Sequence, residues 1–574
     1  MKTFNGIAIS PGIAVGPIFK IRKADISFQR KSISNPQMEW LRYQEAIAIT
    51  KKQLEDLYSI IKRNVDEKDA EIFHAQLLML EDPDLNESIH QIIEVDHINS
   101  ESALMDAVNS YIANIESLQD EYLRGRAIDI RDVAKKVLCN LLNIKESPFD
   151  GLCQPSIIIA DDIAPSDTAI MDKSLVLGFC TVKGGATSHV AILARSMGLA
   201  AVAGIGSDIL NVSEDNNMAI LDGDQGLLVI DPDNHLIKDA LFRQNIAIIR
   251  QSQNRLHAND PAVTIDKHKV EIFANIGNEK EAKEAIIAGC EGIGLLRTEF
   301  IYMQSDHLPT EQEQYCIYKN ILDIFGMKPV ILRTLDIGGD KKLPYFDLPK
   351  EENPFLGQRG IRLCLAYPEL IKPQLRAALR AANGHNLHIM FPMVADISEV
   401  KAAKELISVC YKELNKEGTL ISPSIKIGIM IEIPAAALIA DKLAKEVDFF
   451  SIGTNDLSQY TLAADRTNAS VANLASAFHP AVLKLIQKII IDAHALGKKV
   501  GLCGELGSEP EAAPILLGLG LDEFSMNPVA IPGIKSVLRQ LSFENTQAFV
   551  NSVLQAPDSA SVKKMVRESF PQIF

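Results

Sequence analysis

The sequence predicts a multidomain α/β protein with a C-terminal (β/α)8 TIM barrel and an N-terminal α/β domain that carries an inserted helical bundle. Its 574 residues correspond to about four domains at ~150 residues each. Strand-like runs flank a long stretch with helical spacing, and eight evenly spaced strand-like runs follow it. With 47% hydrophobic and 23% charged residues, the chain has the composition of a globular protein that buries real cores.

The charge balance and the cysteines exclude several classes of protein. Lys and Arg number 58 against 74 Asp and Glu, a formal net charge of −16, whereas duplex nucleic acid requires clustered cations. The eight cysteines form no CxxC pair, which argues against a zinc ribbon or a disulfide scaffold and favours reduced thiols in a cytosol. No segment approaches the ~20 apolar residues that span a bilayer. We therefore expect a cytoplasmic protein with no nucleic acid partner and no membrane insertion.

The N-terminal half predicts an α/β domain interrupted by helices. Residues 7–18 mix β-branched residues with glycine and proline, which is typical of a short strand and tight turns. Over residues 36–142, apolar residues recur at spacings of three and four, which predicts a bundle of amphipathic helices broken near Pro83. Short strand-like runs punctuated by glycine and aspartate return over residues 156–230.

The C-terminal half predicts a connecting helix and then a barrel. Residues 234–258 are charged, helical and free of glycine, and Asn259-Asp260-Pro261 ends them. Eight β-branched or apolar runs then alternate with helical stretches: VEIFANIG, EGIGLLRTEF, PVILRTLDIG, NLHIMFPMV, IKIGIMIEIP, VDFFSIGTND, KKVGLCGE and LDEFSMN. Eight such β/α units fit a TIM barrel. The predicted domains are an α/β domain over 1–34 and 145–230, a helical insertion over 35–144, a helical linker over 231–260 and the barrel over 261–574.

Charged residues close most of the barrel runs, at the strand ends where barrel active sites lie. Glu432 and Asp456 close neighbouring runs and are hard oxygen ligands for Mg²⁺. Arginines can grip phosphate and carboxylate with two parallel hydrogen bonds. Together these ends predict a site for a small phosphorylated carboxylate, although each residue by itself also fits a salt bridge at the barrel rim. The candidates are Arg297, Arg333, Asp336, Glu432, Asn455, Asp456, Arg466 and Cys503.

Cys503, in the seventh run, has two interpretations. A lone cysteine at a strand end is usually an inert small hydrophobe. Beside a metal and arginines, its thiol would instead exchange a proton with the substrate, because cations lower the pKa of a thiol toward neutrality.

A second candidate centre is the segment GGATSHVAILAR at residues 184–195. Its two glycines predict a turn, and Thr187 or Ser188 can cap a helix whose first turn contains His189. Free amide N–H groups and the helix dipole favour an anion there. The residues alone leave open whether His189 carries a phosphoryl group or is the surface histidine of an ordinary capped helix.

These motifs resemble those of the PEP-utilising enzymes. GGATSHVAILAR is similar to their phosphohistidine signature, and DFFSIGTNDLSQYTLAADR and GLCGELGSE are similar to their barrel signatures. Pyruvate phosphate dikinase and phosphoenolpyruvate synthase carry an ATP-binding domain ahead of the phosphohistidine domain, whereas the segment before His189 contains only strands and a helical bundle. By this layout the chain is identified as a member of the Enzyme I family of the bacterial phosphotransferase system.

The resemblance implies a reaction and partners. His189 would accept the phosphoryl group of phosphoenolpyruvate, release pyruvate and pass the group to a histidine of the phosphocarrier protein HPr, starting sugar uptake. HPr would dock on the helical insertion, and the barrel would form a homodimer. Because His189 must meet both the barrel and HPr, we predict a rigid-body swing about residues 231–261. Ala186 stands where the family commonly has a basic residue.

The resemblance also implies residue roles. Glu432 and Asp456 would hold Mg²⁺, and Cys503 would protonate the departing enolate. The implied substrate-binding residues are Arg297, Arg333, Asn455 and Arg466, with Lys341 and Arg359 as weaker candidates. Two other classes remain open: a nucleotide-dependent enzyme that phosphorylates pyruvate, and a regulator that binds phosphoenolpyruvate without using His189.

Overall fold

The computed structural model describes most of the chain in two compact units, residues 1–248 and 249–574. The predicted site residues His189 and Lys341, together with Ala186, lie outside the described residues. Side chains at 57, 59–64, 114–116, 121–129, 173, 212 and 473 are also left out. The residues not described are 22–26, 65–75, 117–120, 145–148, 150, 164–170, 185–189, 191–193, 195–196, 213–216, 340–342, 344, 347–350, 423–424, 467 and 469–470.

The first unit contains a mixed sheet with strand order β1-β8-β7-β3-β4-β5-β6-β2. The neighbours from β3 to β6 pair in parallel, and the other neighbours pair antiparallel. Strand β4 is buried over its whole length, as a β-branched run with both faces covered requires. The strands are β1 (Lys2–Asn5), β2 (Ile7–Ser10), β3 (Ile13–Lys20), β4 (Ser156–Ala160), β5 (Val176–Thr181), β6 (Ala200–Ala203), β7 (Met218–Asp222) and β8 (Leu227–Ile230).

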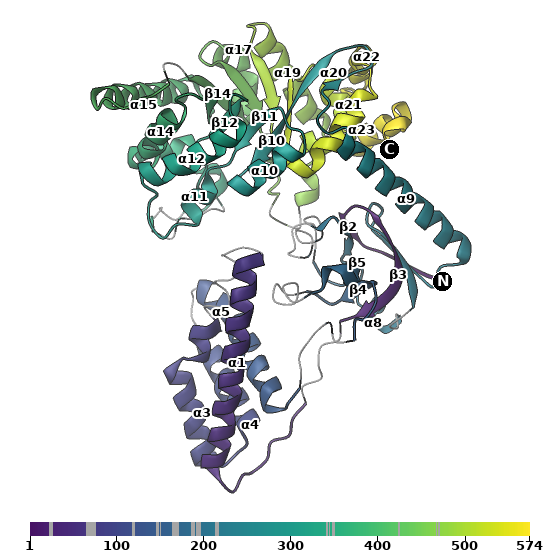
Figure 1. Cartoon of the computed structure of the whole chain (residues 1–574), viewed down its shortest axis with the longest axis vertical. Coiled ribbons are helices and arrows are strands. Elements are labelled where there is room, and N and C mark those ends of the chain that lie inside the picture. The colour runs from purple at the N-terminus through teal and green to yellow at the C-terminus, as the bar shows by residue number, and fades with distance from the viewer. Residues whose placement is uncertain are drawn as a thin grey trace. The chain divides into compact units, whose positions relative to one another are not determined.

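Between β3 and β4 the chain forms helices that pack side by side (Figure 1). Their shared core contains Tyr43, Leu54, Ile89, Leu104 and Val137, the apolar positions that the spacing of three and four brings to one side of each helix. The break near Pro83 is a helix start, because the Asp82 carboxylate accepts a hydrogen bond from the Leu85 amide at 3.0 Å. The helices are α1 (Pro36–Asn64), α3 (Pro83–Asp96), α4 (Ser100–Glu116) and α5 (Glu121–Leu141).

The second unit contains a closed barrel of eight parallel strands, β10 to β17, in which β10 pairs with both β11 and β17. The predicted (β/α)8 barrel is therefore confirmed, and each predicted run contains one strand. A short strand, β9 (Ala262–Val263), adds antiparallel to β10. The barrel strands are β10 (Lys269–Ile276), β11 (Gly292–Leu296), β12 (Val330–Arg333), β13 (Leu387–Phe391), β14 (Lys426–Ile431), β15 (Phe449–Ile452), β16 (Lys499–Leu502) and β17 (Glu523–Met526).

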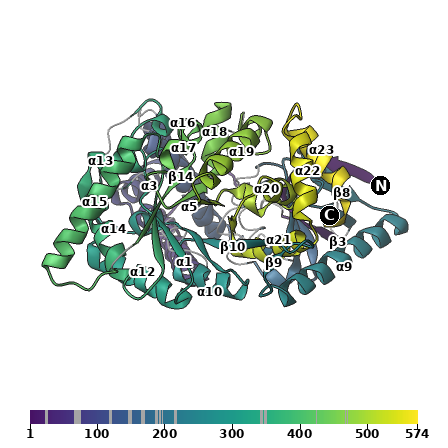
Figure 2. The same cartoon turned by 90° about the horizontal axis from the view of Figure 1, so that it is seen from above.

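Helices surround the barrel strands, as Figure 2 shows from above. Their apolar faces and the outward-facing side chains of the strands form one large core. The long helix α9 (Asn234–Leu256) precedes the barrel, and α8 (Asp208–Val212) belongs to the first unit. The remaining helices are α10 (Glu279–Ile287), α11 (Glu299–Met303), α12 (Glu311–Phe325), α13 (Ile361–Ala366), α14 (Pro368–Ala381), α15 (Ile397–Lys416), α16 (Pro434–Leu438), α17 (Ala440–Leu443), α18 (Thr454–Leu462), α19 (Pro480–His494), α20 (Ala513–Gly518), α21 (Ile531–Arg539), α22 (Phe543–Val553) and α23 (Ser559–Ser569).

The barrel interior is filled by the alternate side chains that face inward. A separate apolar cluster occupies it and contains Leu295, Ile331, Met390, Met430, Phe449 and Cys503. The Phe449 ring lies against Gly428 on the neighbouring strand, where a Cβ atom would be 2.3 Å from the ring. Gly428 is therefore required for packing inside the barrel.

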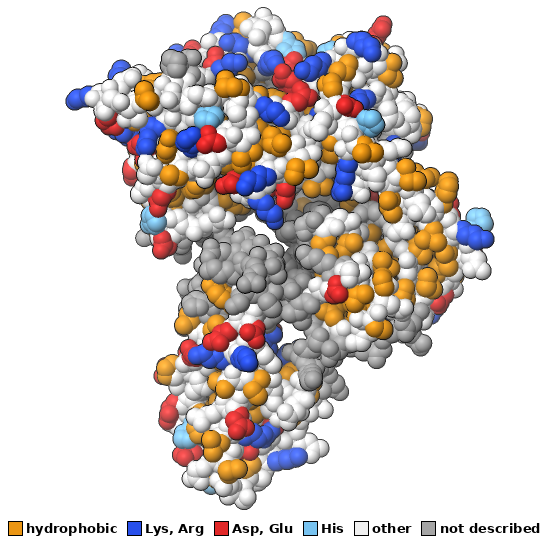
Figure 3. Space-filling model, viewed as in Figure 1, with side chains coloured by type: hydrophobic (Ala, Val, Ile, Leu, Met, Phe, Trp, Pro, Cys, Tyr) orange, Lys and Arg blue, Asp and Glu red, His pale blue; other side chains and the backbone are white. Residues whose placement is uncertain are grey.

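The state of the cysteines and the mixture of charges on the surface agree with what the composition predicts. All eight cysteines are free thiols. Basic and acidic side chains intermix over the face of the barrel drawn in Figure 3. Among the described helices, none is long and apolar enough to cross a bilayer.

We predict that Gly428→Ala destabilises the barrel by about 1–3 kcal/mol, because the added methyl group forces the Phe449 ring from its place. The measurement is denaturant-induced unfolding of the full chain. Gly533→Ala is the matched control, because its Cβ would meet no atom within 4 Å and it lies in helix α21. It should be neutral or slightly stabilising. Equal stability of the two variants would contradict the role assigned to Gly428.

Candidate active site

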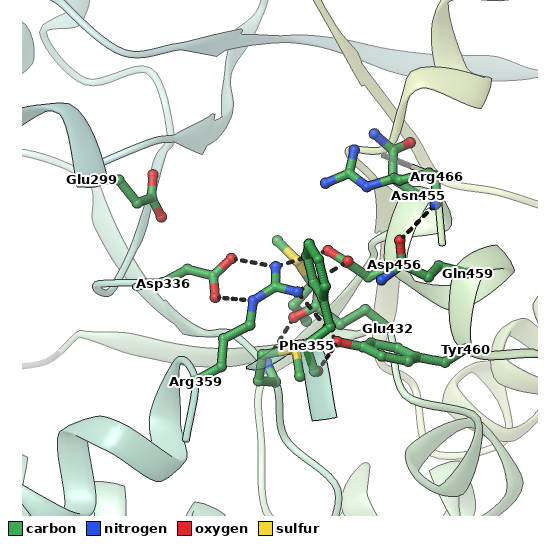
Figure 4. Close-up of polar contacts among 12 residues, drawn as sticks. Glu299, Asp336, Phe355, Arg359, Glu432, Asn455, Asp456, Gln459, Tyr460 and Arg466 are labelled. Carbon is green, nitrogen blue, oxygen red and sulfur yellow. Dashed lines mark hydrogen bonds and ion pairs between the residues drawn. The ribbon is translucent and has the colours of Figure 1, made fainter. Parts of the chain in front are cut away.

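Arg359 joins two aspartates at the carboxyl ends of the barrel strands (Figure 4). Its Nε and Nη2 atoms donate to the two Asp336 carboxylate oxygens, both at 3.0 Å. Its Nη1 and Nη2 atoms donate to Asp456 Oδ1 and Oδ2 at 3.2 and 3.1 Å, and Nη1 also donates to the Tyr460 hydroxyl at 3.2 Å. All five N–H groups of this guanidinium thus have acceptors. Arg359 is only 3% exposed, so these ion pairs form away from bulk water.

Local sequence explains why these three charges meet. Asp336 lies just after β12, and Asp456 lies in the first turn of α18, which begins two residues after β15 ends. An acidic side chain is favoured in a first turn by the helix dipole. Arg359 precedes α13 and is fixed by the Tyr460 hydroxyl, which in turn donates to the Phe355 carbonyl at 2.6 Å.

Glu432 follows β14 and is fully enclosed, with 1% of its surface exposed. Its Oε1 atom accepts a hydrogen bond from the Met393 amide at 2.6 Å. Burial raises the pKa of this carboxyl to about 8, and the negative charges of Asp456 and Asp336 add to the rise. The carboxylates of Glu432, Asp456 and Asp336 therefore crowd one region that a further cation would stabilise.

Arg333, the last residue of β12, is also buried. Its Nη2 atom donates to Glu299 Oε1 at 2.6 Å, and its Nη1 atom lies 3.5 Å from Asp336 Oδ2. Glu299 and Asp336 keep the pKa of Arg333 above its usual range although burial acts to lower it. Its Nε atom is buried without a hydrogen-bond partner among the described residues. One donor of Arg333 thus remains to be satisfied.

The loops after β15 and β16 are held together by Asn455 and Glu505. Asn455 Oδ1 accepts from the Glu505 amide at 3.0 Å, and Asn455 Nδ2 donates to Glu505 Oε1 at 3.2 Å. The contact requires Gly504, whose Cβ would lie 2.6 Å from the Thr454 backbone nitrogen. The glycine in the GLCGE motif therefore brings the two loops together.

Arg297 and Arg466 differ from Arg333 in their surroundings. Arg297, just after β11, is exposed, and its amide donates to the Ile276 carbonyl at 2.8 Å. The Arg466 amide donates to Gln459 Oε1 at 3.2 Å, while its Nε atom is buried without a partner among the described residues. Arg466 thus has a hydrogen-bond donor available for a ligand.

Cys503 lies inside the barrel, and the structure corrects one expectation about it. For the proton-exchanging interpretation we expected cations to lower the pKa of the thiol toward neutrality. It is instead 5% exposed within the apolar interior cluster. Burial raises its pKa to about 11, since the opposing effects of the Ser451 hydroxyl and Arg333 are smaller. Desolvation favours the neutral thiol more strongly than a nearby arginine favours the thiolate.

The structure brings Arg333, Glu432, Asp456 and Cys503 together: Arg333 and Glu432 act on the pKa of each other and of Cys503, and the charge of Asp456 raises the pKa of Glu432. The structure also shows that Arg359 pairs with both Asp336 and Asp456, whereas the sequence made it only a weaker candidate for substrate binding. Glu299, Tyr460 and Gln459 were missed. Two signals for them were present in the sequence: Glu299 lies two residues after Arg297, and Gln459 and Tyr460 lie about one helical turn after Asp456. They were missed because the prediction considered residues at strand ends, and none of these three ends a strand.

Glu432 and Asp456 have the chemistry of a divalent-cation site. Among the described residues, no group of three or more His, Cys, Asp and Glu side chains is arranged to hold a metal ion. Mg²⁺, however, commonly takes one or two carboxylates and completes its shell with substrate phosphate and water. The crowding that raises the Glu432 pKa is relieved by a bound cation, so the two carboxylates fit this ion.

Comparisons with known proteins agree with the geometry. Three family models match: the PEP-binding domain of PEP-utilising enzymes over residues 251–543, their N-terminal domain over 5–126 and their mobile domain over 152–226. The phosphoenolpyruvate-protein phosphotransferase of Bacillus subtilis is 43% identical over 570 residues, which cover 99% of this chain and 100% of that protein. The protein of the same name from Staphylococcus carnosus is 43% identical, with 99% of each chain covered.

The chain belongs to this family of PEP-utilising enzymes. The resemblance to Enzyme I that the motifs indicated is confirmed. The match extends through both the barrel and the N-terminal unit, so the family assignment does not depend on the barrel fold alone.

We predict that Arg359→Met destabilises the barrel by about 3–5 kcal/mol, because Asp336 and Asp456 are then buried without their counter-charge. Arg359→Lys should recover only part of this loss, since an ammonium cannot donate to both carboxylates in the same fork geometry. Arg297→Met is the control and should change the unfolding free energy by less than about 0.5 kcal/mol. Denaturant unfolding of the full chain measures all three, and unchanged stability of Arg359→Met would contradict the assigned role.

Proposed function

We propose that this chain is a phosphoenolpyruvate-protein phosphotransferase that phosphorylates His189 and then the phosphocarrier protein HPr. The observation that carries the proposal is the cluster of buried arginines and carboxylates at the strand ends, where Arg359 pairs with Asp336 and Asp456 beside Glu432. Relatives that carry this activity in their names align with nearly the full chain. A small dianionic phosphate with a carboxylate is the ligand that such a cluster recognises.

In the proposed reaction, arginines bind and orient phosphoenolpyruvate. Arg333 and Arg466 each have a buried Nε donor without a partner among the described residues, which supports contacts to phosphate or carboxylate oxygens. Arg297 and Asn455 would complete the substrate site from the loops after β11 and β15. Fixed donors stabilise charge that spreads over the phosphoryl oxygens in an in-line transfer.

Glu432 and Asp456 would hold Mg²⁺ in this proposal. When bound, the ion neutralises phosphoryl charge and orients the phosphate group. Arg359 and the Met393 amide hold in place the two carboxylates that would bind it.

Cys503 would give its proton to C3 of the enolpyruvate that remains after transfer. An acid must carry its proton at the working pH, and the buried thiol does so because its pKa is raised to about 11. Burial of the thiol opposes the expected fall in its pKa and thus supports the acid role.

The remaining assignments concern parts beyond the barrel site. His189 would accept the phosphoryl group, and HPr would dock on the insertion at residues 35–144. A swing about residues 231–261 would carry His189 between the two, a homodimer would form through the barrel, and the protein would act in the cytoplasm. A cross-link that locks residues 231–261 tests the swing. The locked protein should lose at least one of the two half-reactions, phosphorylation of His189 or transfer to HPr.

The first test is incubation of the full chain with phosphoenolpyruvate, Mg²⁺ and purified HPr, followed by mapping of the phosphorylated residue. We expect phosphohistidine at residue 189 and transfer to HPr without ATP or AMP. His189→Ala should abolish the phosphoenzyme while the barrel still binds phosphoenolpyruvate. A stable protein phosphate in that variant would refute the assignment of His189, and a requirement for nucleotide would favour a dikinase-type enzyme.

We predict that Cys503→Ala lowers pyruvate formation by at least about 100-fold, because general acid catalysis contributes about 10²–10⁴-fold. Phosphoenolpyruvate binding, measured by calorimetry, should change little. Cys410→Ala is the matched control, as it removes another buried thiol, in helix α15 away from the strand ends. Activity of Cys503→Ala equal to that of the control would return Cys503 to the class of inert core residues.

A further inference from the structure

The barrel interior contains a second buried acid that the proposed reaction does not use. Glu523, the first residue of β17, is 9% exposed, and its Oε1 atom has no hydrogen-bond partner among the described residues. Its position is fixed by two glycines: a Cβ on Gly294 would lie 2.4 Å from Oε1, and a Cβ on Gly501 would lie 3.0 Å from it. Glycines on two strands therefore make room for this carboxyl in the lumen.

Strand register places Glu523 beside Gly501, one layer below Cys503. Ser451, Gly501 and Glu523 form one row across β15, β16 and β17. Cys503 comes two residues after Gly501 and so faces the same way, one layer nearer the carboxyl ends of the strands. Because Gly501 has no side chain, the space below the thiol is bordered by the Ser451 hydroxyl and the Glu523 carboxyl.

Ser451 is suited to connect these two groups. Its hydroxyl lies close enough to Cys503 to lower the pKa of the thiol, yet its Oγ atom has no well-aligned hydrogen-bond partner in the described part of the chain. A hydroxyl both donates and accepts a proton, and buried unpaired polar groups are typical sites for bridging water.

We propose that Glu523 is the internal proton source that returns a proton to Cys503 after each turnover, through the Ser451 hydroxyl and water in the space above Gly501. This inference rests on the proposed role of Cys503 as the acid. When the S–H bond breaks and a C–H bond forms at C3 of enolpyruvate, a thiolate remains. The O–H bond of Glu523 then breaks as the S–H bond re-forms, with Ser451 taking one proton and giving another.

The carboxylate left on Glu523 regains its proton from solvent at the foot of the barrel. Glu271 is the register partner of Glu523 on β10, and it accepts a hydrogen bond from Lys499 Nζ at 2.8 Å in a partly exposed ion pair. This pair lies at the amino-terminal ends of the strands. The proposed route therefore leads from solvent to the thiol along the barrel axis and does not pass through the substrate site.

The charges around Glu523 favour its protonated form. Burial, helped by the charges of Glu271 and Asp522 and opposed by Lys499, raises its pKa to about 8. Cys503 faces it from β16. The carboxyl thus holds a proton at neutral pH and loses it as the pH rises through about 8, so repeated turnover should decline over that range.

The test uses Glu523→Gln and Gly501→Ala in the full chain. The first removes the proton source, and the second fills the space between Ser451 and Glu523 with a methyl group whose nearest contact there is a flexible carboxyl end. Glu291→Gln is the matched control, since Glu291 Oε1 is also buried without a hydrogen-bond partner among the described residues but lies before β11, 3.9 Å from Lys535 Nζ. Melting curves establish that each variant is folded.

Two measurements follow with phosphoenolpyruvate and Mg²⁺. In a single turnover, all variants should release one pyruvate per site at the wild-type rate, because the stored thiol proton suffices. With excess HPr, Glu523→Gln and Gly501→Ala should turn over at least tenfold more slowly and lose the decline above pH about 8. When enzyme in H₂O is mixed into D₂O, first-turnover pyruvate should carry deuterium in its methyl group from wild type and hydrogen from the two variants.

The outcomes distinguish a failure of the proton relay from a failure of the proposed function. Wild-type turnover and isotope content in Glu523→Gln would overturn the relay, as would an equal loss of the first and later turnovers. If the wild-type chain forms no phosphoenzyme, the proposed function fails instead. If Cys503→Ala retains turnover, the acid assignment fails.

Discussion

The two-sided ion pair of Arg359 is the interaction on which the site depends. Three carboxylates, from Asp336, Glu432 and Asp456, lie within a buried region at the strand ends. Like charges in a low-dielectric environment repel strongly, and a fold that gathers them needs a compensating cation. The planar guanidinium satisfies two of them with parallel hydrogen bonds and leaves the third, Glu432, to be stabilised by protonation or by a cation that arrives with substrate.

The inward-facing positions of the barrel combine charged and apolar side chains. Near the carboxyl ends, Arg333 on β12 and Glu432 after β14 are charged. An apolar cluster that includes Met390, Met430 and Phe449 surrounds Cys503. The Glu523 carboxyl lies in the row of Ser451 and Gly501, one layer nearer the amino ends of the strands than Cys503. The proposed acid is thus separated from water and bordered by ionisable groups above and below.

Burial away from water determines whether each ionisable group in the barrel interior keeps its proton. The thiol of Cys503 and the carboxyls of Glu432 and Glu523 all have raised pKa values, and burial is the largest cause in each case. A buried acid that keeps its proton is a donor, so the same effect that is unfavourable for charge makes proton transfer possible at neutral pH. Arg333 and Arg359 stay charged although they are buried, because their carboxylate partners lie within hydrogen-bond distance.

The sequence by itself determined the eight strands, their order and the residues at their ends, because strand periodicity and glycine punctuation are local properties. The motifs were sufficient to indicate the family. The pairing of Arg359 with Asp336 and Asp456, over separations of 23 and 97 residues, was decided only when barrel closure brought the loops together. The same holds for the thiol of Cys503 and the row that contains Glu523, since burial and register are properties of neighbouring strands and no single segment of the chain encodes them.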